Sequence, residues 1–207
     1  MIVLIDNGHG SNTPGKRSPD AVKGLTGSPH YLRECEWTRG AARDLGIALR
    51  SRGIEAGILV TEETDVPLAT RAQRVNNVCR QRGKDNVLLV SIHINAAGNG
   101  DKWLNARGWS IYTSKGVTKS DQLADCIFQE AVKQFRAPLS VRRSMDKYLE
   151  RDFEENFTIL AKTQCPAVLV ENFFQDNRDD VAYLKSAAGR VACVDVMARG
   201  IEAYLRK

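Results

Sequence analysis

Short runs of apolar, mostly β-branched residues alternate with segments of helical spacing, and this alternation constrains the fold more than any other feature. The runs cover residues 2–6, 56–61, 87–93, 108–113 and 167–171. Apolar residues at steps of three and four predict helices over 38–52, 68–82, 119–135 and 191–205. Strands that alternate with helices favour an α/β fold with a largely parallel sheet covered on both faces.

Two stretches interrupt this rhythm. Residues 10–31 are rich in Gly, Ser, Pro and Thr, and residues 137–156 are polar and strongly charged. Structureless segments of this length are uncommon inside a compact domain and often form lids or binding loops. With 207 residues in total, the chain suits one domain, so we expect both stretches to be loops of a single unit over 1–207.

The net charge narrows the possible partners only a little. A formal charge of +5 and a pI near 9.0 favour an anionic polymer, a membrane surface or a bacterial wall. The basic stretches at 80–84 and 141–143 lack interleaved aromatic residues, which makes nucleic acid the least favoured partner. The longest apolar runs are far shorter than the ~20 residues that cross a bilayer, so we expect no membrane span.

The five cysteines are dispersed, odd in number and form no C-x-x-C pair. We therefore expect buried, reduced thiols rather than a disulfide framework or a cysteine-rich metal site. Met1 is followed at once by the first predicted strand, which leaves no basic region or cleavage site of a signal peptide. The sequence as written predicts a protein made in the cytoplasm.

Two of the three histidines follow predicted strands. His9 lies between Gly8 and Gly10, which let the backbone turn sharply and leave the imidazole accessible, and His93 ends the third run. Ligands of open parallel sheets bind outside the carboxyl ends of the strands. Either histidine alone fits a structural role, but the pair predicts a metal site.

A catalytic zinc ion usually takes three protein ligands, with two histidines and one glutamate among the known sets. Glu34 and Glu36 open the first predicted helix, just before its periodic stretch at 38–52, and Glu34 lies near the centre of the apolar stripe whereas Glu36 falls on the opposite face. A carboxylate on the apolar side is costly unless it is paired or bound to a cation, so we expect His9, Glu34 and His93 to hold one Zn²⁺. Two alternatives stay open: Glu34 as a helix-start carboxylate facing the helix dipole, and His30 as a competing residue nearby.

Glu171 closes a buried apolar run, which is unusual for an acid. Hydrolysis at zinc needs a base that takes a proton from water and returns it to the leaving nitrogen. An apolar environment raises a carboxyl pKa toward the working range, so Glu171 is the candidate catalytic residue, with a helix cap or an Arg pair as the alternative. Asp6 is a candidate to orient His9 through its second ring nitrogen, with a strand-end hydrogen bond as the alternative.

Five segments, in order along the chain, resemble the zinc-dependent N-acetylmuramoyl-L-alanine amidases of the amidase-3 catalytic family. They are residues 5–10 (IDNGHG), 32–37 (LRECEW), 91–96 (SIHINA), 166–177 (PAVLVENFFQDN), and Val60-Thr61 with Asp65, Leu68 and Arg71. The resemblance fits His9, Glu34 and His93 as zinc ligands and Glu171 as the catalytic glutamate. Two positions depart from the family pattern: Asn7 stands in place of the usual Pro, and Glu62 in place of Arg after Thr61. Neither touches a proposed ligand, so the departures leave the substrate preference open and not the chemistry.

The resemblance implies an open, twisted sheet, a single catalytic domain over 1–207, and cleavage of the amide between N-acetylmuramic acid and L-alanine. The implied partners are peptidoglycan or muropeptides, reached by release as in a phage-type lysin or as a trimmed secreted enzyme. Asn95 in the second histidine motif is a candidate substrate contact, and Arg142, Arg143 and Lys147 are candidates for the carboxylates of the stem peptide, with a solvated basic face as the alternative for the three basic residues. Two other functions stay open: a zinc peptidase acting on free peptides, and a non-catalytic wall-binding module.

Overall fold

The alternating runs form one six-stranded sheet in the computed structural model, which describes residues 1–144 and 151–207. The strands are β1 (Ile2–Asn7), β2 (Glu55–Ile58), β3 (Val87–Asn95), β4 (Ser110–Thr113), β5 (Phe153–Glu154) and β6 (Ala167–Phe174), in the order β2-β1-β3-β6-β4-β5. β1 to β3 and β6 pair in parallel, and β4 runs antiparallel to β6. The expected α/β fold with a largely parallel sheet is therefore confirmed.

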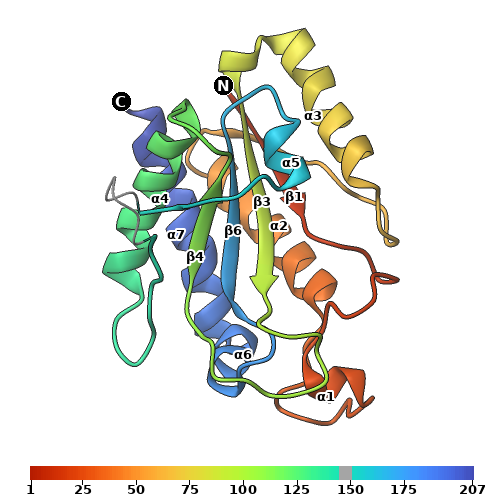
Figure 1. The fold of residues 1–207 in the computed structure, drawn as a ribbon. Coiled ribbons are helices and arrows are strands. Elements are labelled where there is room, and N and C mark those ends of the chain that lie inside the picture. Colours follow the sequence, from red (N-terminus) through yellow and green to blue (C-terminus); the bar gives the residue numbers. More distant parts are fainter. Residues whose placement is uncertain (145–150) are drawn as a thin grey trace.

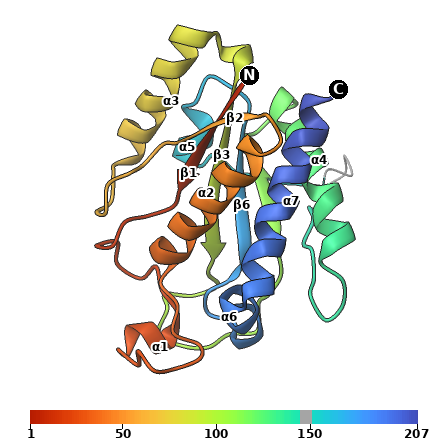
Figure 2. The same cartoon turned by 180° about the vertical axis from the view of Figure 1, so that it is seen from behind.

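Helices cover both faces of this sheet (Figures 1 and 2). They are α1 (Pro19–Val22), α2 (Glu34–Arg50), α3 (Leu68–Arg82), α4 (Lys119–Gln134), α5 (Thr158–Ala161), α6 (Arg178–Lys185) and α7 (Ala187–Leu205), with a 3₁₀ turn at Lys84–Asn86. α2, α4 and α7 pack against one face, and α3 and α5 against the other. Among the described residues, no helix is both long and apolar enough to cross a membrane.

The sheet is apolar on both sides because successive strand residues point to opposite faces. In β3, Leu88 and Val90 join the core under α2, α4 and α7, whereas Val87 and Leu89 join the smaller core under α3. A strand buried on both faces is a continuous apolar run, which is the pattern that the sequence shows.

The predicted element bounds differ from the structure mainly at their ends. The helix expected over 68–82 is found at those residues, and α2 begins at Glu34, as the placement of Glu34 at the helix start predicted, but ends at Arg50 rather than residue 52. β6 continues to Phe174. The short helices α1, α5 and α6, and the two-residue strand β5, were not predicted. A helix of four to eight residues completes too few turns to show a helical period, and a strand of two residues shows no alternation. All five cysteines are free and buried, as expected.

Candidate metal centre

Three neighbouring strands, β1, β3 and β6, bring two histidines and a glutamate together near their carboxyl ends, which form one end of the sheet (the sheet edge). His93 in β3 is the register partner of Glu171 in β6, so the two residues lie side by side on adjacent strands. His9 lies two residues beyond the end of β1, and the amide of the intervening Gly8 donates to the Ile92 carbonyl at 2.9 Å. The imidazole rings of His9 and His93 meet edge to face, with their centroids 4.9 Å apart.

Glu34 completes the group from the first turn of α2. Its side chain is fully buried, as the helical periodicity predicted, whereas that of Glu36 is 63% exposed. Glu34 Oε1 accepts from the Ile94 amide at 3.0 Å and lies 3.1 Å from His93 Nδ1 and 3.5 Å from His9 Nε2. One ligand atom from each of His9, Glu34 and His93 lies within 4.8 Å of the others, and this is the metal-like cluster found among the described residues.

Two carboxylate oxygens at this edge are buried without a hydrogen-bond partner among the described residues: Oε2 of Glu34 and Oε2 of Glu171. Buried polar atoms are normally paired, so an orphaned pair in one place indicates a missing ligand. Two imidazoles and one carboxylate form a donor set that zinc accepts. The residues therefore fit a zinc ion chemically.

Burial and mutual charge shift the pKa values of all four groups. Burial lowers the pKa of His9 to about 4, which keeps its imidazole neutral at pH 7, the form that binds a metal. Burial opposes the charged forms of His93 and Glu34, but their hydrogen bond and opposite charges prevail, raising the pKa of His93 and lowering that of Glu34. Burial raises the pKa of Glu171 to about 7, within the range of a general base.

The glycines beside His9 act differently from the expectation. The left-handed conformation falls on His9 itself, with φ of 62°, and not on Gly8 or Gly10. A Cβ at Gly8 would lie 2.5 Å from the His93 ring, and one at Gly10 would lie 2.0 Å from the Asp65 amide nitrogen. The two glycines therefore provide room for their neighbours, and the turn depends on a strained histidine.

Asp6 does not orient His9, so that expectation is corrected. Its two carboxylate oxygens accept from Arg71 Nη1 at 2.7 Å and from the Ser91 hydroxyl at 2.6 Å, in line with the alternative of a strand-end hydrogen bond. His30 lies away from the cluster, where its ring contacts Trp103 and Arg178.

The candidate substrate residues separate in space. The Asn95 side chain accepts from the neighbouring Ala96 amide, and the Arg142 guanidinium lies over the rings of Phe174 and Phe153, at 5.1 and 5.6 Å from their centroids. Arg143 instead lines a hollow along α4, and Lys147 is outside the described residues.

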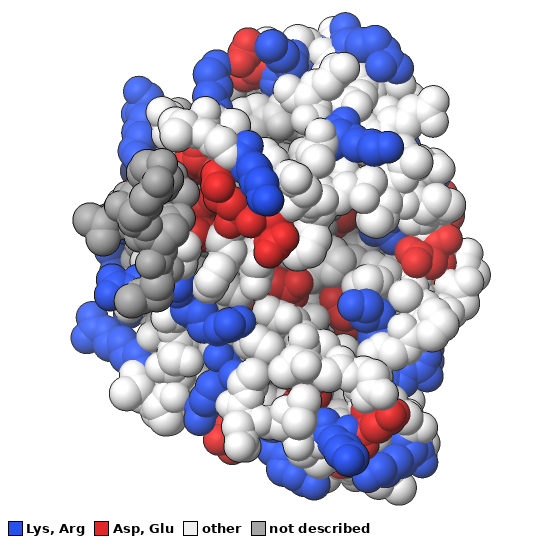
Figure 3. All heavy atoms as spheres, viewed as in Figure 1, with Lys and Arg blue, Asp and Glu red and all other residues white. Residues whose placement is uncertain are grey.

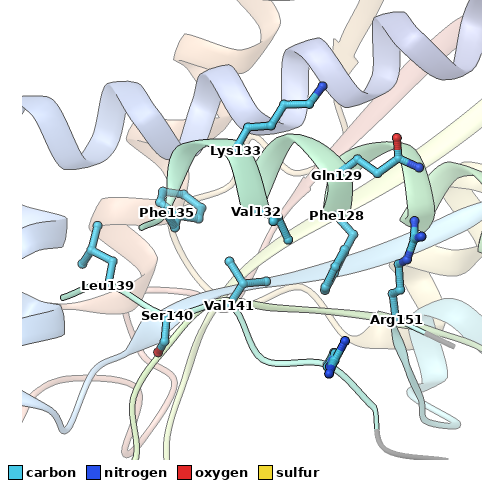
Figure 4. Close-up of a pocket in the computed structure, with 10 residues that line it drawn as sticks. Phe128, Gln129, Val132, Lys133, Phe135, Leu139, Ser140, Val141 and Arg151 are labelled. Carbon is cyan, nitrogen blue, oxygen red and sulfur yellow. The ribbon is translucent and has the colours of Figure 1, made fainter. Parts of the chain in front are cut away.

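That α4 hollow has a volume of about 800 Å³ and is lined by none of the four strand-edge residues (Figure 4). Its apolar lining is Phe128, Val132, Phe135, Leu139 and Val141, and its cationic residues are Lys133, Arg143 and Arg151. Lys133 and Arg151 already pair with Glu130 and Asp125 of α4. Figure 3 shows acidic side chains in a separate hollow near the middle of the face, where Figure 1 places the end of β3.

Lys16 was missed by the sequence reasoning. The positive charge of this loop residue lowers the pKa of His9, Glu34 and Glu171, so it acts on three of the four groups at the sheet edge. Its backbone carbonyl accepts from the Glu34 amide at 3.1 Å, which ties the loop to the start of α2. A lysine in an irregular loop carries no sequence pattern that would have indicated this position.

Comparisons with known proteins show which proteins the chain is similar to. The family model described as N-acetylmuramoyl-L-alanine amidase matches residues 3–203. The chain is 28% identical over 189 residues to an endolysin of Bacillus phage SPP1, covering 89% of this chain and 58% of that protein. It is 24% identical over 234 residues to the N-acetylmuramoyl-L-alanine amidase AmiC of Neisseria meningitidis serogroup B, covering 99% of this chain and 52% of that protein. It therefore spans little more than half the length of these two relatives.

The fold also matches solved structures. The crystal structure of an N-acetylmuramoyl-L-alanine amidase from Clostridium difficile 630 superposes with a TM-score of 0.78 at 24% identity, covering 100% of this chain and 97% of that one. The catalytic domain of CwlV, an amidase from Bacillus (Paenibacillus) polymyxa, superposes with a TM-score of 0.77 at 21% identity, covering 99% and 98%. At these identities the likeness concerns the fold.

Proposed function

The chain belongs to the N-acetylmuramoyl-L-alanine amidase family, and we propose that it is a zinc-dependent amidase. The proposed reaction is hydrolysis of the amide bond between N-acetylmuramic acid and L-alanine in peptidoglycan or muropeptides. We propose that residues 1–207 act as one catalytic domain and that the site of action is the bacterial cell wall. The names of the relatives, an endolysin and a cell-wall amidase among them, support this proposal.

One observation carries the metal assignment: His9, Glu34 and His93 converge within 4.8 Å while Glu34 Oε2 stays buried and unpartnered. A buried carboxylate oxygen without a partner is costly, and a bound cation would remove that cost. When bound there, one zinc ion supplies a Lewis acid that acidifies a water molecule and polarises an amide carbonyl.

Glu171 is the proposed general base and acid. Its Oε2 is unpartnered, and it lies beside His93, one of the proposed zinc ligands, in the sheet register. A carboxyl with a pKa raised to about 7 both accepts a proton from water at Oε2 and delivers it to the leaving nitrogen near neutral pH. Burial raises this pKa, and the positive charges of His93 and, less strongly, of Lys16 oppose the rise.

Substrate contacts are proposed on the same side. Arg142, held over Phe174 three residues beyond Glu171, is the proposed partner of a stem-peptide carboxylate. Asn95 lies two residues beyond His93, and its remaining amide hydrogens are available to a substrate carbonyl. Arg143 faces the α4 hollow, so it is the weaker candidate of the two arginines.

Zinc content and muropeptide hydrolysis, measured together on the wild type and on Glu171→Gln, test the proposal. We expect one bound zinc in both proteins and a rate reduced about 10²- to 10⁴-fold in the variant, the usual contribution of a general base. Glu36→Gln, an exposed glutamate of the same helix as Glu34, is the matched control and should keep full activity.

A second substrate separates the alternatives. Hydrolysis of muropeptides but not of the same peptide without its sugar supports an amidase, whereas hydrolysis of the free peptide supports a peptidase. Binding to peptidoglycan without any turnover by the wild type would identify a wall-binding module and overturn the proposed reaction.

A further inference from the structure

His9 is held in a conformation that its own sequence does not favour. Its φ of 62° lies in the left-handed region, which is sterically unfavourable for a residue with a Cβ atom. Such strain persists only where the surrounding structure over-determines the backbone, and it concentrates at functional sites. The backbone of this turn sets the direction of the His9 imidazole, so the groups that hold the turn also aim the ring.

Side chains from two helices bind three successive carbonyls of the turn. Arg71 Nη1 from α3 donates to the Asn7 carbonyl at 2.7 Å, and the Thr38 hydroxyl from α2 donates to the Gly8 carbonyl at 3.1 Å. Arg39 Nη1, also from α2, donates to the His9 carbonyl at 3.2 Å. The donors lie 30 or 64 residues away in sequence, so the turn is fixed by tertiary contacts.

Both arginines also bind the segment that supports the turn from outside. Arg39 Nη2 donates to the carbonyls of Glu62 and Glu63 at 2.7 and 3.1 Å, and Arg71 Nη2 donates to Asp65 at 2.8 Å. The Glu63 carbonyl accepts from the Ser11 amide at 2.9 Å. Guanidinium groups, with several donors in a rigid fork, are suited to join backbone segments in this way.

The helix that supplies Glu34 therefore also fixes His9. Thr38 lies four residues beyond Glu34 and so shares its face of α2, and Arg39 follows directly. Because α2 carries Glu34 and also holds the backbone of His9, this one helix sets the distance between the two proposed zinc ligands.

We infer that Arg39, Thr38 and Arg71 are positioning residues that clamp the Asn7–His9 turn and aim the His9 imidazole at Glu34 and His93. This inference rests on the proposed function, because His9 is a ligand of the proposed zinc ion. None of the three touches the reacting atoms.

Arg39 offers the sharper test, because it is half-buried, whereas Arg71 is 1% exposed and paired with Asp6, so its loss endangers folding. We would compare Arg39→Gln with Arg43→Gln, which removes an exposed arginine one turn further along α2, and Thr38→Val with the exposed Thr61→Val. Each full-length protein is stripped of metal and titrated with zinc against a chromophoric chelator. Hydrogen exchange of the Gly10 and Ser11 amides is measured on the metal-free proteins, with thermal unfolding as the check on global stability.

We expect Arg39→Gln to weaken zinc binding by about 10- to 100-fold, the usual effect of losing a group that orients a ligand. Thr38→Val should act in the same direction but less strongly, since only one donor is lost. Both should speed exchange at Gly10 and Ser11 at unchanged unfolding temperature, and Arg39→Lys, with charge but no fork, should recover only part of the affinity. The two controls should match the wild type.

The outcomes separate the clamp from the zinc site. Wild-type protein that binds zinc, with Arg39→Gln equal to it in affinity and exchange, overturns the clamp alone. Wild-type protein that binds no zinc overturns the proposed metal centre and, with it, the assignment of the clamp to a ligand.

Discussion

The sheet edge that carries His9, Glu34, His93 and Glu171 differs from the α4 hollow in how its charges are satisfied. At the sheet edge, buried carboxylate oxygens lack partners and the pKa values of all four groups are shifted. In the α4 hollow, Lys133 and Arg151 are paired with Glu130 and Asp125 of α4. The two regions therefore differ in what a bound ligand would satisfy: a cation at the sheet edge would pair buried carboxylate oxygens, whereas the α4 hollow holds two cations that already have partners.

The strongest test of this contrast is Glu34→Gln. The substitution keeps the shape of the side chain but removes the negative charge that two histidines face, so zinc affinity should fall by more than the ~100-fold that outer contacts usually contribute. Zinc titration measures the effect, with Glu36→Gln as the control. Retention of tight zinc binding would show that the orphaned oxygen has another explanation.

Gly8→Ala should come next in size. The added methyl group would lie 2.5 Å from the His93 ring, so either the ring or the turn must move. Overpacking of this kind typically costs about 1–3 kcal/mol, and we expect the loss in both unfolding free energy and zinc affinity. Gly24→Ala is not a matched control because Gly24 has a positive φ, whereas Gly27→Ala, with open space around it, should be neutral.

A smaller effect should appear in the pH dependence of stability without metal. The pKa of Glu171 in the folded protein, about 7, lies above its ordinary value of 4.5, so the folded state binds the proton more tightly. The resulting stability is complete below about pH 4.5 and is lost as the pH rises through 7. Glu171→Gln cannot ionise, so its unfolding free energy relative to the wild type should increase over this window and level off above it.

Chemical denaturation of both metal-free proteins at several pH values measures this difference. Comparing the two proteins removes most of the opposite contribution of His9, whose lowered pKa costs stability as the pH falls through 6.5 toward 4. A constant difference between pH 4.5 and 8 would mean that Glu171 is hydrated and ordinary, which would weaken its case as the base.

The smallest effect is expected in the α4 hollow. Lys133→Gln removes an exposed ion pair, which should change stability by less than about 0.5 kcal/mol and leave muropeptide turnover unchanged. Arg142→Gln, which removes the proposed partner of a stem-peptide carboxylate near the sheet edge, should raise KM for muropeptides and leave kcat unchanged. A rise in KM for Lys133→Gln instead would make the hollow part of the substrate site.

Much of the fold and the candidate site followed from local patterns. A strand buried on both faces is a continuous apolar run in the sequence. The end of each run predicted where the sheet edge lies, and this placed His9, His93 and Glu171 there. Helical periodicity distinguished buried Glu34 from exposed Glu36, because residues on one face recur every three to four positions. Periodicity is a property of the chain itself, so a sequence determines it without knowledge of what packs where.

Only the tertiary structure decided how these residues meet. The register that sets His93 beside Glu171, the left-handed backbone of His9, and the partners of Asp6 all depend on contacts between segments far apart in the chain. Arg142 and Arg143 are neighbours in sequence but face different surroundings, which no local pattern separates. Local spacing therefore determined which face or edge each side chain occupies, whereas the packing of distant segments decided its partners. The physical reason is that a side chain reaches only a few ångströms, so its contacts depend on which segments the fold places beside it.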